Sequence, residues 1–200
     1  LPASLHRQFP NVQNLAIDDL TLNFGSDTVL AILTQWQLTT LGLNVELEEP
    51  QATALCDHIN TIQSLKRLSL GYFPDGHMSR LAPTLARLER FVIEALDDAP
   101  VVFRHLSASC THLRYDAPLI VSQLRQAYNI NAQLFGRLTH FELNLKLMNQ
   151  SDGKVLDSLC EQATNLQHLF IRFNDYEVRD GNSFKNQSLL TFRLRRGVTQ

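Results

Sequence analysis

A short pattern recurs along the whole chain: an anchor residue is followed by apolar residues three and five positions later. Leu38, Leu41 and Leu43 form its clearest copy. The eight anchors are Val12, Leu38, Leu65, Leu88, Cys110, Leu138, Leu166 and Leu189. Successive anchors are 26, 27, 23, 22, 28, 28 and 23 residues apart, a period typical of solenoids built from one small unit per repeat. Because the repeats run from end to end, we expect residues 1–200 to form a single domain.

Each copy of the pattern reads as a strand that is exposed on one side, since polar and apolar residues alternate through 40–44 and through 140–144. A doubly wound sheet would bury both faces of every strand and give continuous apolar runs. A turn and a helix-like segment follow each strand, so the strands should be parallel. The sequence therefore predicts an α/β fold: a right-handed, horseshoe-like solenoid of about eight repeats, with a parallel concave sheet and helices on the convex side.

The connections between the strands carry helix signals of different kinds. Proline is favoured in the first turn of a helix, and three connections contain one at a suitable place: Pro50, Pro83 and Pro100. After Pro118, the apolar spacing predicts one long helix over 119–135. The last connection, residues 174–187, is polar, and we expect a loop there with at most one short turn of helix.

The bulk composition argues against several classes of protein. A net charge of −2 gives no electrostatic basis for binding nucleic acid or an anionic membrane. No apolar run approaches the roughly 20 residues that span a bilayer. Cys56, Cys110 and Cys160 lie on apolar positions, so we expect reduced core residues and an intracellular compartment. The Asn-x-Ser sequons at Asn149 and Asn186 point the other way.

Outward residues at equal distances from the anchors should form columns, because stacked strands lie about 4.8 Å apart. Two residues past the anchors, the column reads Asn14, Thr40, Arg67, Arg90, His112, His140, His168, Thr191. Four residues past, it reads Ala16, Gly42, Ser69, Val92, Arg114, Glu142, Phe170, Arg193. Six residues past, it reads Asp18, Asn44, Gly71, Glu94, Asp116, Asn144, Arg172, Arg195.

The second half of this face mixes charged and aromatic residues, as binding hot spots do, whereas the first half is small and plain. We predict that a protein partner binds the second half. The predicted contact residues are Arg114, His140, Glu142, His168, Phe170, Arg172, Arg193 and Arg195. The alternative is a solvated sheet face, with binding on loops or on repeats outside this chain.

The histidine column allows two interpretations. Three ligands in a line fit a tetrahedral ion poorly, and no carboxylate or cysteine shares the column, so we expect no metal site. Protonated neighbours would repel one another near the unperturbed pKa of about 6.5, which predicts a pH-dependent surface.

No set of residues predicts catalysis. Cys56, Asp57 and His58 are neighbours in sequence, but neighbours on a helix do not face each other. The chain contains no glycine-rich phosphate loop, no G-x-S-x-G and no H-E-x-x-H, the motifs that would indicate nucleotide binding, a hydrolase or a zinc protease. We therefore expect neither an enzyme nor a bound cofactor.

The anchored strands and their spacing resemble the leucine-rich repeat superfamily along nearly the whole chain. Two polar helix starts, 26–30 and 151–156, are similar to those of the ribonuclease-inhibitor-like group, especially the repeats that follow an F-box. That family usually places Asn or Cys three residues after the second strand leucine, and of the eight positions here only Asn174 does so.

The resemblance implies a non-catalytic recognition module that binds a protein on its concave face. It also implies the substrate-binding part of an F-box-type ubiquitin-ligase receptor, cytoplasmic or nuclear. Because the chain starts at Leu1 and ends without a polar cap, we expect a fragment of a longer protein, whose preceding N-terminal region would hold the ligase adaptor. The alternative is an extracellular or cell-surface leucine-rich-repeat recognition domain.

Overall fold

A computed structural model gives the three-dimensional structure of this protein. It describes residues 7–19, 33, 36–45, 49–73, 76–95, 99–146, 156, 159–179 and 182–193. From residue 173 onward only the backbone is described.

The described strands form one sheet whose spatial order follows the chain, from β1 to β8. The first seven strands are parallel to their neighbours, and β8 is antiparallel to β7. Their bounds are β1 Asn14–Asp19, β2 Thr40–Val45, β3 Arg67–Tyr72, β4 Arg90–Ala95, β5 His112–Ile120, β6 His140–Lys146, β7 His168–Arg179 and β8 Asn182–Arg193. The expected α/β class and parallel sheet are thus confirmed for seven strands.

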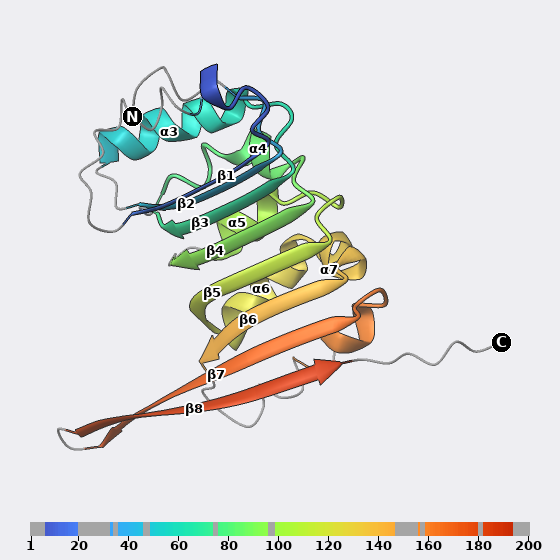
Figure 1. Ribbon diagram of the computed structural model, residues 1–200. Coiled ribbons are helices and arrows are strands. Elements are labelled where there is room, and N and C mark those ends of the chain that lie inside the picture. Colours follow the sequence, from blue (N-terminus) through green and yellow to red (C-terminus); the bar gives the residue numbers. More distant parts are fainter. Residues whose placement is uncertain are drawn as a thin grey trace.

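Helices fill the connections and pack on one face of the sheet. They are α3 Glu49–Thr61, α4 Ala82–Leu85, α5 Ala99–His105, α6 Val121–Ile130 and α7 Ala132–Arg137. The helix signals of the three prolines are confirmed, since each lies within the first two residues of α3, α4 or α5. In Figure 1 the strands stack in order and α5, α6 and α7 lie behind them. The opposite face, in front in this view, is covered by none of the described helices; we call it the open face.

One hydrogen-bond arrangement repeats at the start of the strands. The N–H groups of Thr39 and Thr40 both donate to the carbonyl oxygen of Gln13, at 2.8 and 3.0 Å. The same pair of bonds occurs at six successive junctions, with the acceptors Gln13, Thr39, Lys66, Glu89, Thr111 and Thr139. Each acceptor directly follows an anchor residue, so every strand begins at the same point of its repeat.

The anchors and the inward strand residues form the core with the helices. The anchors from Leu38 to Leu166 are at most 3% exposed. Phe103 of α5 lies at the centre of an aromatic cluster: it stacks on Phe135, with centroids 5.6 Å apart, and also contacts Tyr115 and Phe141. The buried residues of strands and helices form one continuous cluster, which accounts for the alternating burial of β2 and β5.

The prediction of a single helix over 119–135 is wrong in two respects: the helix begins later than expected, and it is divided into α6 and α7. Leu119 and Ile120 extend β5, where they pair with Leu145 and Lys146. The helix then breaks at Asn131, whose side-chain oxygen accepts the N–H of Leu134 at 3.2 Å and so caps α7. The Asn131 amide also donates to the carbonyls of Phe103 and Leu106, at 2.9 and 2.7 Å. A contact with a distant helix therefore fixes the break, and apolar spacing alone does not reveal it.

The loop expected over 174–187 is also wrong. β7 runs to Arg179 and β8 begins at Asn182, and the two strands pair along their whole lengths. In Figure 1 this hairpin extends beyond the ends of the other strands. Two residues, Asp180 and Gly181, link the strands, and Asp-Gly is among the pairs most favoured in tight hairpins. This local signal predicts the hairpin better than the polarity of the segment does.

Two of the three cysteines lie in the core, as expected. Cys56 and Cys110 are fully buried, Cys160 is half-buried, and none of the three forms a disulfide. Burial raises the pKa of the Cys56 and Cys110 thiols to about 12. In the part of the chain that the structure describes, no helix has the length and apolar character to cross a membrane.

We predict that Phe103→Ala destabilises the fold by about 3–5 kcal/mol, because it removes the centre of the aromatic cluster and leaves a cavity. Arg104→Ala, at the exposed neighbouring position, is the matched control and should change the free energy of unfolding by less than about 0.5 kcal/mol. Urea denaturation followed by circular dichroism measures both. Equal effects of the two substitutions would contradict the described packing.

We also predict that a thiol reagent such as Ellman's reagent distinguishes the cysteines, because the reactive species is the thiolate. At pH 8 the folded protein should react at Cys160 alone, and a Cys160→Ser variant should be inert until urea unfolds it. Two thiols should then react in the variant. Rapid labelling of the folded Cys160→Ser protein would show that the other two cysteines are accessible.

Candidate functional site

The parallel register aligns outward side chains into columns on the open face. The first column is Asn14, Thr40, Arg67, Arg90, His112, His140 and His168, each paired with the next. The second is Ala16, Gly42, Ser69, Val92, Arg114, Glu142 and Phe170. Both predicted columns are confirmed from β1 to β7.

The third column departs from its expected register at β5. A shift between Tyr115 and Pro118 pairs Asn144 with Pro118 instead of Asp116. The amide of Asn144 compensates by donating to the carbonyl of Asp116 at 2.9 Å. The carboxylate of Asp116 is thereby left on the open face beside Arg114.

Arg114, Asp116 and Glu142 form an ionic cluster in the middle of the open face. The Arg114 guanidinium lies 2.6 Å from Asp116 and 3.5 Å from Glu142. The hydrogen bond with Asp116 is the main reason why the pKa of Arg114 is raised. Two of the predicted contact residues, Arg114 and Glu142, are therefore brought together and hold each other in place.

Phe170 and Arg172 continue this surface on β7. Phe170 neighbours Glu142 in the register, and the Arg172 guanidinium lies 6.0 Å from the centroid of its ring, the outer limit of a cation–π contact. The structure thus places a half-buried aromatic ring among charged groups, as predicted.

Arg193, the first of the two predicted C-terminal arginines, does not take its predicted register. Because β8 is antiparallel, Arg193 pairs with His168, and Thr191 pairs with Phe170; a parallel strand would have placed Arg193 beside Phe170. Arg195 lies outside the described residues. The predicted column with Arg193 beside Phe170 is therefore wrong, and the register instead places Arg193 beside His168, another of the predicted contact residues.

His112, His140 and His168 stack face to face. Ring centroids are 4.1 Å apart for the first pair and 4.3 Å for the second, with interplanar angles of 11° and 22°. Parallel stacking sets the ring nitrogens side by side, and this does not direct them at a common point. Among the described residues, no group of three or more His, Cys, Asp or Glu could hold a metal ion.

A threonine sets the tautomer of the middle histidine. The hydroxyl of Thr139 lies 3.0 Å from Nδ1 of His140 and donates to the carbonyl of Thr111 at 3.1 Å. A hydroxyl has one hydrogen, so Nδ1 must be the donor in its contact with Thr139. The lone pair of neutral His140 is then on Nε2. Thr111 and His112 have the same arrangement, with a longer hydroxyl–carbonyl distance of 3.5 Å.

The surroundings of the stack oppose protonation. Burial lowers the pKa of His112, and the charges of Arg90, Arg67 and His168 lower it further. Burial also lowers the pKa of His140, followed by His112, His168 and Arg90, while Glu142 opposes the shift. His112 and His140 are therefore mostly neutral at pH 7 in the free protein.

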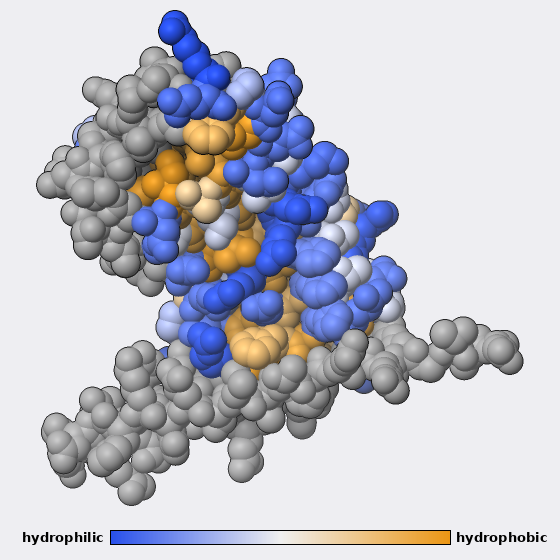
Figure 2. Space-filling model, viewed as in Figure 1, coloured by the Kyte–Doolittle hydropathy of each residue, from blue (hydrophilic) through white to orange (hydrophobic). Residues whose placement is uncertain are grey.

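The first half of the open face contains a shallow hollow of about 450 Å³. Its floor includes Ala16, Gly42 and Ser69, and the arginines Arg67 and Arg90 line it. Figure 2 shows hydrophilic side chains along the edge where the strands begin and paler or apolar surface in the middle of the face. The small residues of this half gave no prediction of binding, although small side chains leave room for a ligand.

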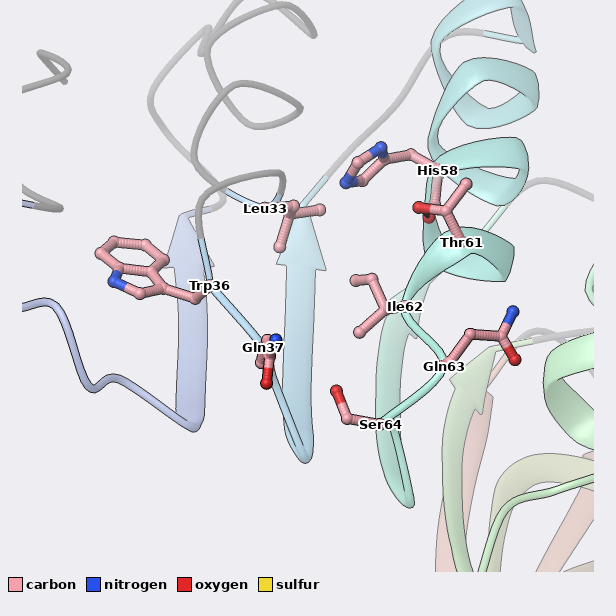
Figure 3. A pocket seen from close by; sticks show the side chains of 8 residues that line it. All are labelled: Leu33, Trp36, Gln37, His58, Thr61, Ile62, Gln63 and Ser64. Atoms are coloured by element: carbon pink, nitrogen blue, oxygen red, sulfur yellow. Dashed lines mark hydrogen bonds between the residues drawn. The ribbon is translucent and has the colours of Figure 1, made fainter.

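A second pocket, of about 540 Å³, lies near the start of the sheet on the helix side. Figure 3 shows His58 of α3 pointing toward Leu33 across it. Nε2 of His58 is buried and has no hydrogen-bond partner in the described part of the chain. The hydroxyls of Thr61 and Ser64 also line this pocket, but they donate to the backbone carbonyls of His58 and Leu38, at 2.7 and 2.8 Å. Its described lining contains no cysteine or carboxylate.

Cys56, Asp57 and His58 diverge, as expected for helix neighbours. The Cys56 thiol points to the carbonyl of His77 at 3.8 Å, and Asp57 pairs with Arg80 at 3.2 Å. The three side chains therefore do not form a catalytic set.

Comparison with known proteins identifies no family. No family model matches the chain, and no curated protein is significantly similar to it.

We predict that acidification destabilises the fold through the histidine stack. The pKa of His112 and of His140 is lower in the folded state, so the unfolded chain binds protons first as the pH falls through about 6.5. The melting temperature should therefore fall more between pH 7.5 and 5.5 in the natural protein than in a His112→Gln, His140→Gln variant. His105→Gln on α5 is the control. An identical decrease in all three proteins would contradict this coupling.

Proposed function

We propose that this chain is a leucine-rich-repeat solenoid that binds another protein on the open face of its sheet and has no catalytic role. One observation carries the proposal: seven parallel strands present their outward side chains in aligned columns on a face that no described helix covers. Extended binding surfaces are what stacked repeats provide.

The repeated backbone geometry supports the solenoid part of the proposal. The same pair of hydrogen bonds joins successive units at six junctions, as expected where each repeat contacts only its neighbours. In a horseshoe the open face would be concave. The eighth copy of the pattern, at Leu189, falls in the antiparallel strand β8, so the horseshoe would contain seven units and a return strand.

The chemistry of the second half of the open face supports a protein partner. Arginine and aromatic residues dominate binding hot spots, and a ring of polar residues excludes water around them. Phe170 and Arg172 supply such a centre, and Arg114 and Glu142 form its polar surround. Arg114 is already ion-paired, so it is held ready without further ordering.

We further propose that the domain is the substrate-binding part of an F-box-type ubiquitin-ligase receptor, in which a preceding region would contact the ligase adaptor. The resemblance of the repeats motivates this assignment. We place the protein in the cytoplasm or nucleus because none of its three cysteines forms a disulfide, as is usual in reducing compartments. Glycan found on Asn149 or Asn186 would instead favour the extracellular alternative.

We predict that a photo-crosslinking amino acid introduced at Phe170 captures a protein partner in cells. The same group at Glu161, an exposed position on the helix side, should not capture that partner. Adding Glu142→Lys should reduce the yield at Phe170 about tenfold or more, because it reverses a charge directly beside the centre of the proposed interface. Mass spectrometry of the crosslinked band identifies the partner.

Equal capture from the two positions would contradict binding on the open face. In the full-length protein, a ligase adaptor in the same complexes would support the F-box assignment, and its absence from complexes that contain the partner would contradict it.

A further inference from the structure

The first column of the open face changes character along the sheet. From β3 to β7 it consists of two arginines and three histidines, paired in register on five neighbouring strands. We call this set the cationic ladder: Arg67, Arg90, His112, His140 and His168. With about 4.8 Å between strands, the ladder is roughly 19 Å long.

No described carboxylate neutralises the arginine end of the ladder. The nearest acidic side chain in sequence, Glu89, forms its ion pair with Lys66 at 2.6 Å. Glu142 and Asp116 both face Arg114. Arg67 and Arg90 are exposed and form no ion pair with any described residue. Their charges reach the neighbouring histidines, where they oppose protonation.

We propose that the cationic ladder and the adjoining hollow bind an extended acidic segment of the partner protein, which crosses the strands of the open face. This inference rests on the proposed function and names the chemistry of the partner. Carboxylates would meet Arg67 and Arg90 through charge-assisted hydrogen bonds. At about 3.3 Å per residue, some six residues of extended chain match the length of the ladder.

The hollow gives such a segment a place for its backbone. Arg67 and Arg90 belong both to the ladder and to the lining of the hollow, alongside Ser69 and Gly42. A chain that lies over these small residues has its acidic side chains beside the two guanidinium groups.

The histidine end of the ladder makes this binding depend on pH. In the neutral state Nε2 of His140 carries a lone pair, because Nδ1 donates to Thr139. Such a nitrogen repels a carboxylate, whereas protonated Nε2 donates a hydrogen bond to it. The charged and titratable groups around the stack are Arg67, Arg90 and Glu142, together with the histidines themselves. Arg193 of β8 also pairs with His168 in the register. A bound anionic segment would offset the repulsion between the two arginines and a protonated histidine. The histidines would then bind protons more readily, so binding of the segment would be accompanied by proton uptake.

The charges of the open face favour a protein segment over nucleic acid. Glu94, Asp116 and Glu142 lie on the same face. A nucleic-acid strand is wider than the single row of cations, so its phosphates would also lie near these carboxylates and be repelled by them. The net charge of −2 adds no long-range attraction for a polyanion.

The test uses fluorescein-labelled hexaglutamate, with hexaglutamine as the uncharged peptide and a six-nucleotide oligothymidylate as the nucleic acid. We expect hexaglutamate to bind about tenfold more tightly at pH 5.5 than at 7.5, and calorimetry in buffers of different ionisation enthalpy to show proton uptake. Arg67→Gln with Arg90→Gln should weaken binding about tenfold at both pH values. His112→Gln with His140→Gln should remove the pH dependence. Arg104→Gln with Arg125→Gln, exposed cations on the helices, should change neither property.

Absence of hexaglutamate binding at both pH values would overturn the inference, as would equal losses in the ladder and helix variants. Tighter binding of oligothymidylate than of hexaglutamate would assign the ladder to nucleic acid and overturn it as well. The proposed function is judged separately: if the partner crosslinked at Phe170 is captured equally well with excess hexaglutamate at pH 5.5, the ladder inference fails while protein recognition on the open face stands.

Discussion

The backbone hydrogen bonds at the start of each strand determine the rest of the structure. Two N–H groups of one unit share a single carbonyl oxygen of the unit before it, and the acceptor directly follows the buried anchor. Unpaired backbone groups are costly to bury, so this junction fixes where every strand begins. Connections of different length, from the short α4 to the pair α6 and α7, are therefore accommodated without a change in the point at which the next parallel strand begins.

A fixed register has a consequence for surface chemistry. A residue type that recurs at one point of the repeat becomes a continuous line across the sheet, as the stacked histidines illustrate with ring separations close to 4 Å. Like charges in such a line repel one another. On the described open face, Arg67 and Arg90 share one column and form no ion pair with a described residue, whereas Arg114 lies in the next column with its carboxylate partners. The return strand β8 pairs with the edge of β7, an edge that would otherwise be open to other chains.

The sequence predicted which residues lie on the open face, but it predicted neither the hollow nor the position of Arg193. The columns that include Arg114, Glu142 and Phe170 could be predicted from the anchor spacing alone, because strand periodicity and parallel order permit only one register. The hollow could not be predicted from the anchor spacing, because a cavity depends on which residues surround Gly42 and Ser69 in space. The prediction for Arg193 failed for another reason: its neighbour depends on the direction of β8, and the repeat pattern led us to expect a parallel strand where the structure has an antiparallel one.

The sequence by itself determined the α/β class, the inward and outward residues and the order of the strands, since hydrophobic periodicity and covalent order act locally. Only the tertiary structure decided where elements end. Asn131 breaks a helix because its amide reaches carbonyls of α5, and Ile120 stays in β5 because Lys146 pairs with it. The tautomer of His140 likewise depends on Thr111, a residue of the preceding repeat. These features arise from contacts between residues more than ten positions apart, and local patterns carry no record of them.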